Sequence, residues 1–143
     1  MFSYQLSLMH NPSILITTLS RQFKITEHLP AYIDEVRAEL NILEIPVFLV
    51  IDATHLQISF SDLIIALRLI AHPKNPVALV RHPSIRQIIG VSEHSLVKMG
   101  INTLTQKDYG NLPAKSFPTL DEAFAYIQDV ADEADEADKA QIS

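Results

Sequence analysis

Cysteine is absent from the sequence of 143 residues, and glycine occurs only three times. Without cysteine the chain cannot have a disulfide framework, thiolate metal ligands or thiol catalysis. This is compatible with a reducing compartment, and we expect the protein to be cytoplasmic. Gly90, Gly100 and Gly110 are too far apart to form the glycine-rich loop that cradles a phosphate in nucleotide-binding folds.

Long apolar runs and clustered basic residues are also lacking. No run approaches the roughly 18–20 apolar residues that span a bilayer, so no transmembrane segment is expected. The N-terminal segment has neither the basic region nor the apolar core of a signal peptide. The 11 Lys and Arg residues are scattered, which argues against nucleic acid as a partner because phosphate contacts need clustered positive charge.

Acidic residues are concentrated near the C-terminus. Residues 132–138, DEADEAD, carry five acidic groups, and without them the chain is close to neutral rather than at its formal net charge of −6. The length predicts one domain over residues 1–131, followed by an acidic tail over 132–143. The tail could be a solvated helix end, which we favour, or an acidic interaction arm.

The first half of the chain has clear periodic patterns. Residues 4–10 alternate and residues 14–19 form a β-branched run, and the Asn11-Pro12 turn between them predicts an antiparallel hairpin. A helix capped by Thr26 follows, with apolar residues at helical spacing up to Leu43. The continuous apolar run 47–51 then predicts a strand that is covered on both faces.

The second half is predicted from shorter signals. A helix opened by Ser61 and a strand over 77–80 are expected first. A helical region from Pro83 follows, in two pieces around Gly90, and ends at Gly100. The last expected elements are a strand over 101–105, a loop over 106–118 and a helix with the capping box Thr119–Glu122. The element order is therefore β-β-α-β-α-β-α-β-α. Alternation of strands and helices after a hairpin predicts an α/β fold, with a mixed β-sheet and helices packed against it.

Catalytic and metal-binding signatures are few. The sequence has no G-x-S-x-G or H-E-x-x-H motif, and its six histidines lack the usual ligand spacing, so we expect no metal, no cofactor and no enzymatic activity. Asp52 ends a buried strand, where it could organise the next loop by accepting backbone N–H groups, which we favour, bind a cation, or act as a base. His55 follows in that loop, as an ordinary exposed residue or as a ligand contact. An enzyme would have to use Asp52 and His55 as a catalytic pair.

Ser61 is the other candidate. As the N-cap of its helix, its hydroxyl would accept a backbone N–H that has no partner within the helix. As a phosphoacceptor, it would hold a phosphate against the positive end of the helix dipole, although Asp62 beside it would repel that phosphate.

The segment from Val50 to Ile64, together with the element order, resembles the STAS domain of anti-sigma-factor antagonists and sulfate-transporter tails. In that family a buried strand ends in aspartate, and a serine at the start of the next helix is phosphorylated by a partner kinase, which switches binding off. Asp52 and Ser61 match those two positions. Phe60 and Leu63 stand where the family usually has aspartate and glycine.

A second segment resembles the same group of proteins. The C-terminal pattern from Phe117 to Ile127 looks like the last helix of small bacterial STAS/SEC14-like proteins with the SpoIIAA-like fold. The resemblance implies a non-enzymatic regulatory module that binds a protein partner, such as a kinase, a regulator or a second copy of the chain. Ser59, Ser61, Asp62 and Leu63 are the expected contact residues. The alternative that it implies is a carrier or sensor of a small apolar molecule or a nucleotide.

Overall fold

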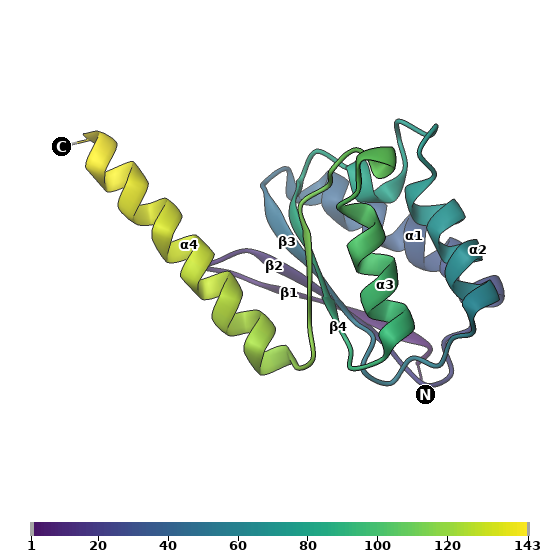
Figure 1. Cartoon of the computed structure of the whole chain (residues 1–143). Helices are drawn as coiled ribbons and strands as arrows, with labels where there is room; N and C mark the ends of the chain where they lie inside the picture. The colour runs from purple at the N-terminus through teal and green to yellow at the C-terminus, as the bar shows by residue number, and fades with distance from the viewer. Residues whose placement is uncertain (1, 143) are drawn as a thin grey trace.

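The computed structural model describes residues 2–142, with side chains described up to residue 134, and shows a five-stranded sheet between two layers of helices (Figure 1). The strands are β1 (Tyr4–Met9), β2 (Ile14–Leu19), β3 (Val47–Asp52), β4 (Ile85–Val91) and β5 (Ala114–Phe117). Their order in the sheet is β1-β2-β3-β4-β5. The β1–β2 hairpin is antiparallel and the other pairs are parallel. The predicted α/β fold with a mixed sheet is confirmed.

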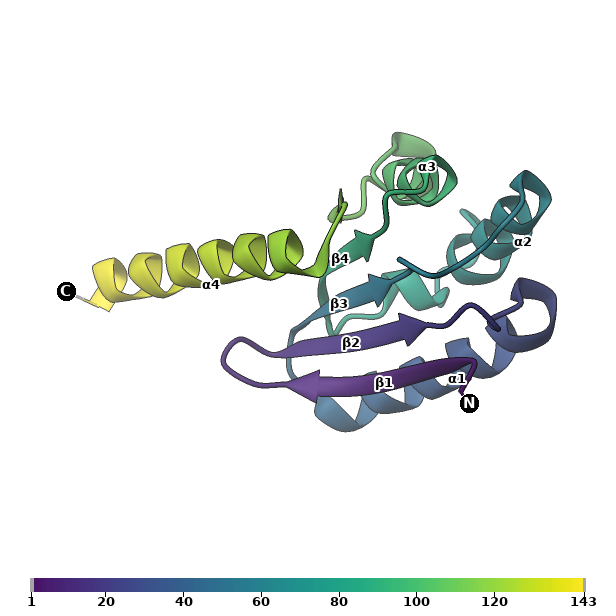
Figure 2. The same ribbon diagram turned by 90° about the horizontal axis from the view of Figure 1, so that it is seen from below.

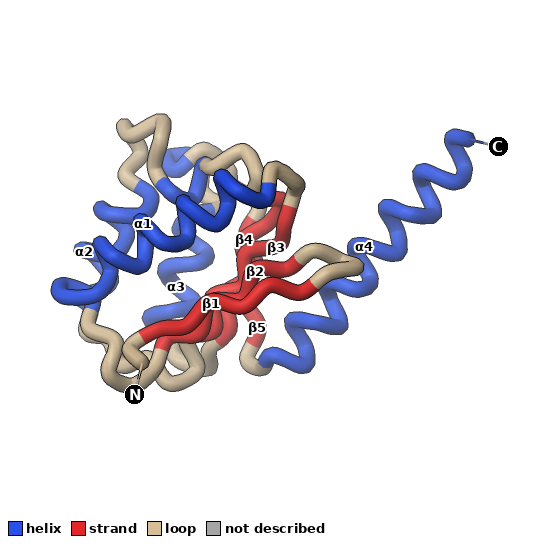
Figure 3. The backbone as a smooth tube through the Cα atoms, turned by 180° about the vertical axis from the view of Figure 1, so that it is seen from behind, coloured by secondary structure: helices blue, strands red, loops and turns tan. Residues whose placement is uncertain are grey.

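The helices divide unequally between the two faces of the sheet. They are α1 (Ile25–Leu43), α2 (Phe60–Ala71), α3 (Ser95–Leu104) and α4 (Leu120–Ile142), with the short 3₁₀ helices η1 (Leu79–Arg81) and η2 (Lys107–Tyr109). Helices α1, α2 and α3 lie on one face, and α4 lies on the other (Figures 2 and 3). Parallel strands joined by helices on the same side require this layered arrangement.

Each face of the sheet has its own core. On the α1 side, Val36 and Leu40 are fully buried among residues such as Leu15 and Leu49. On the α4 side, Ile127 packs with buried residues of β3 and β4. Because β3 faces helices on both sides, its apolar run is continuous, as the sequence predicts.

Several elements of the second half differ from prediction. The strand expected over 77–80 is instead a loop that runs into η1, and the residues expected as a strand over 101–105 form the end of α3. The helical region expected from Pro83 contains β4 in its first part, and the loop expected over 106–118 contains η2 and β5. The run Ile88–Val91 is too short for its period to distinguish a strand from a buried helix, and its pairing with β3 decides for the strand.

Two glycines, predicted to interrupt or end helices, have other roles in the structure. A Cβ on Gly90 would meet Ile101 of α3, with the Cδ1 atom at 2.7 Å, so this glycine allows α3 to lie flat on β4. Gly100 lies inside α3 rather than after a helix, and a Cβ there would be 2.8 Å from Leu63 Cδ1 of α2. Both glycines therefore permit close packing and do not end helices.

The ends of two helices also depart from expectation. Helix α1 begins at Ile25 with Lys24 as its N-cap, not Thr26, and the Lys24 backbone N–H donates to His28 Nδ1 at 2.8 Å. Helix α4 extends well beyond the sheet (Figure 1) and continues through the boundary at residue 131 between the predicted domain and the predicted tail. The tail is therefore helical up to Ile142, and Ser143 lies outside the described residues. None of the described helices is both long enough and apolar enough to cross a membrane.

Candidate functional site

The loop between β3 and α2 is organised by Asp52 at the end of β3. Its side chain is only 6% exposed, and Oδ1 accepts the Thr54 backbone N–H at 3.1 Å and the Thr54 hydroxyl at 2.7 Å. The Ala53 backbone N–H donates to the Val91 carbonyl at 2.9 Å, which ties the loop to β4. A buried carboxylate needs such donors, and here they fix the direction in which the chain leaves the sheet.

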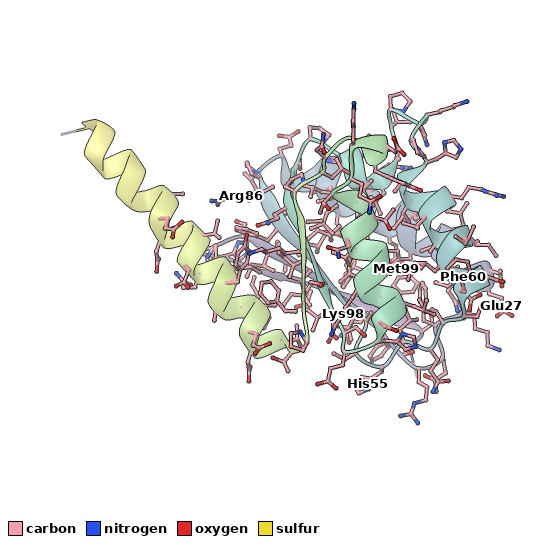
Figure 4. The ribbon with its side chains drawn as sticks, viewed as in Figure 1. Glu27, His55, Phe60, Arg86, Lys98 and Met99 are labelled. Carbon is pink, nitrogen blue, oxygen red and sulfur yellow. The ribbon has the colours of Figure 1, made fainter. Side chains whose placement is uncertain are left out.

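Asp52 and His55 do not form the pair that an enzyme would need. His55 is exposed at the edge of the molecule (Figure 4). Among the described residues, no hydrogen bond joins its ring to the Asp52 carboxylate, which is bonded to Thr54 instead. No group of three potential metal-ligating side chains occurs in this described part of the chain.

Helix α2 begins with a capping box that does not involve Ser61. Ser59 is the N-cap, and its hydroxyl accepts the Asp62 backbone N–H at 3.1 Å. The Asp62 carboxylate accepts the Ser59 backbone N–H at 2.9 Å in return. The prediction that Ser61 caps the helix is therefore wrong, because Ser59 lies three residues before an acid that can reach back to it.

Ser61 is the second residue of α2, and its side chain is exposed. The first backbone N–H groups of a helix have no partner within it, so a phosphate on this side chain would lie near unpaired donors. Asp62, which was expected to face a partner and to repel the phosphate, is half-buried and holds the Ser59 N–H.

Exposed apolar side chains occur next to Ser61 along α2, and another occurs on the adjacent α3. Phe60 is 58% exposed, and Ile64, one turn further along α2, is 44% exposed. Met99 of the adjacent α3 is 49% exposed (Figure 4). We call Phe60, Ser61, Ile64 and Met99 the α2–α3 patch.

Leu63 does not belong to this patch. It is only 6% exposed and packs among the buried residues of α2 and α3, so the expectation that it faces a partner is corrected. The sequence from Leu63 to Ile70 is apolar almost all round the helix, and therefore did not reveal which side is buried. Ile64 was missed for this reason, whereas the exposure of Phe60 and Met99 is marked by no sequence pattern.

An apolar cavity of about 110 Å³ lies between the sheet and helices α1, α2 and α3. Its walls include Leu49 and Ile51 of β3 and Ala66 and Leu67 of α2, and they present no polar surface. A volume of this size without side-chain atoms forgoes about 2.6 kcal/mol of packing stabilisation, at about 24 cal/mol per Å³. That is a substantial fraction of the about 5–15 kcal/mol by which a domain is stable.

Tyr32 of α1 lines the same cavity, but its polar atom is already bonded. Its hydroxyl and that of Thr17 are 2.8 Å apart, and the Thr17 hydroxyl also donates to the Val50 carbonyl at 3.0 Å. Burial raises the pKa of Tyr32, so the ring carries a neutral hydroxyl at ordinary pH. The cavity walls thus present neither a charged group nor a free hydrogen-bonding group.

Comparison with known proteins adds no further guide to the site. No family model, no curated protein and no solved structure matches the chain.

Proposed function

We propose that this protein is a non-enzymatic regulatory module that binds a protein partner through the α2–α3 patch. The observation that carries the proposal is that α2 exposes the Ser61 side chain together with Phe60 and Ile64, next to an α3 that exposes Met99. Apolar residues that gather at the surface beside polar groups are typical of protein-binding sites. The resemblance to STAS domains at Asp52 and Ser61 supports the same function.

Phosphorylation of Ser61 is the proposed switch. The hydroxyl is accessible, and the phosphate would lie at the helix N-terminus without disturbing the Ser59–Asp62 capping box. A dianion on the residue next to Phe60 and three residues before Ile64 would have to be desolvated when a partner covers this part of α2. Phosphorylation would therefore weaken binding to an apolar partner surface.

The test is affinity capture from a lysate of the source organism, followed by titration of the purified captured protein against four variants. Ser61→Asp and Ile64→Glu should weaken binding by roughly tenfold or more, since each places a charge in the covered area. Ser61→Ala should bind like wild type. Ile42→Glu is the matched control, because Ile42 is a 73% exposed apolar residue on α1.

Equal effects of Ile64→Glu and Ile42→Glu would contradict the patch. Full binding by Ser61→Asp, together with loss of binding by Ile64→Glu, would keep the patch and remove the phosphate switch. Intact-mass measurement of protein recovered from source cells, showing the mass of one phosphate that Ser61→Ala lacks, would support the switch directly.

The cavity beneath α2 favours a second function, as carrier or sensor of a small molecule. The apolar walls fit the apolar ligand class and not a nucleotide, whose base and phosphates need polar partners.

A further inference from the structure

We propose that the cavity beneath α2 binds one small non-polar molecule, of about the size of benzene or smaller. The proposal rests on the position of α2, on the chemistry of the cavity walls and on the cavity volume. It rests on the second proposed function, that of a small-molecule carrier, and not on the α2–α3 patch or Ser61, so binding of a protein partner can fail while it holds.

Helix α2 forms the roof of the cavity. It lies between α1 and α3 (Figure 2) and packs against those helices and η1. Its buried residues Leu63 and Leu67 point inward together with Ala66, while Leu49 and Ile51 form the floor on β3. The small side chain of Ala66 borders the cavity, and α2 packs mainly against α1, α3 and η1.

The chemistry of the walls selects the ligand. A buried water molecule needs two to four polar partners, and this cavity offers none. The one polar side chain in the walls, Tyr32, has its hydroxyl paired with Thr17. A ligand with a charge or an unpaired donor would lose its hydration without compensation, whereas a non-polar ligand would lose only unfavourable contact with water.

The volume sets the size of the ligand. An apolar cavity of about 150 Å³ in another protein stays dry and binds benzene or xenon. The cavity of about 110 Å³ here is somewhat smaller. It is therefore large enough for xenon, and a planar ring would require a small outward movement of α2.

The experiment measures amide chemical shifts of the full-length protein by NMR as xenon pressure is raised, and then as benzene is added. In the wild type, shifts should saturate with xenon and concentrate at cavity residues such as Leu49, Ala66 and Val97. Benzene should compete for the same site. Ala66→Leu adds carbon atoms inside the cavity and should weaken xenon binding by roughly tenfold, while Ala38→Leu, at an exposed position of α1, should leave it unchanged.

Two results would overturn the proposal. The first is a xenon response in the wild type that is linear, or spread over the surface, with no saturation at the cavity. The second is equal binding by Ala66→Leu and the wild type. If Ala66→Leu does not fold, Gly100→Ala replaces it, because Gly100 lines the cavity and its added methyl group would lie 2.8 Å from Cδ1 of Leu63, another lining residue. The wild-type titration is decisive in either case.

Discussion

Substitution of Gly90 by alanine tests how closely α3 packs on β4. The backbone at Gly90 is not in the left-handed region, so alanine is allowed there, and a strand interior should gain about 0.5–1 kcal/mol from losing the glycine. The added Cβ would, however, contact Ile101 Cγ1 and would lie 2.7 Å from its Cδ1. Overpacking of this kind costs about 1–3 kcal/mol.

The net effect follows from these two quantities. Ile101 also borders the cavity, so its side chain can move partly away, and the overpacking cost should fall near the lower or middle part of its range. We expect Gly90→Ala to lower the free energy of unfolding by up to about 1.5 kcal/mol, since a cost of about 1–2 kcal/mol is partly offset by a gain of about 0.5–1 kcal/mol. For a chain of this length this corresponds to a fall in melting temperature of about 3 °C per kcal/mol.

A double-mutant cycle identifies the cause. Ile101→Ala removes the two clashing atoms and should cost about 2–5 kcal/mol by itself. In the Ile101→Ala background, the nearest remaining side-chain atom is the Cβ at position 101, at an ordinary contact distance of 3.6 Å from the added methyl group. Gly90→Ala should therefore be neutral or slightly stabilising there. Urea unfolding of the four proteins gives the coupling energy. Equal destabilisation by Gly90→Ala in both backgrounds would refute the packing argument.

Three further predictions concern polar side chains that the structure shows in hydrogen bonds. Asp52→Ala should lower the free energy of unfolding by about 1.5–3 kcal/mol, because the backbone N–H and hydroxyl of Thr54 lose a charged acceptor. Thr54→Ala should cost little more when Asp52 is already replaced. Additive losses in urea unfolding would argue against a stabilising Asp52–Thr54 interaction. Burial raises the pKa of Tyr32 above its ordinary value of 10.0, so the free energy of unfolding should fall by up to about 1.4 kcal/mol per pH unit as pH rises above 10. Tyr32→Phe should make this decline less steep in urea midpoints measured from about pH 9 to 11. An unchanged slope would contradict the assignment to Tyr32. Burial, and to a lesser degree Arg37, lowers the pKa of His82, whose Nδ1 accepts the Ser84 N–H at 3.1 Å. Stability should therefore fall as pH drops below the ordinary histidine pKa of 6.5. In thermal melts between about pH 7 and 5, His82→Gln should show a smaller loss of stability than the wild type.

Local chemistry determined much of the first half of the fold, and the start of α4, from sequence alone. The hairpin turn at Asn11-Pro12, the continuous apolar run of β3 and the capping contact of Thr119 with the Glu122 N–H depend on residues close in the chain. The loop geometry at Asp52 is equally local, since its partner Thr54 is two residues away. Such features can be read from sequence because few other conformations satisfy the same groups.

Tertiary contacts decided what the sequence left ambiguous. The run ending at Val91 became a strand because β3 offered an edge for pairing, and Gly90 serves the approach of Ile101 from a distant helix. Because α2 is apolar nearly all round, its sequence allows either Leu63 or Ile64 to face solvent. The packing of α2 against α1 and α3 buries Leu63 and leaves Ile64 exposed. The cavity also depends on tertiary contacts, because its walls come from strands and helices that are far apart in the sequence.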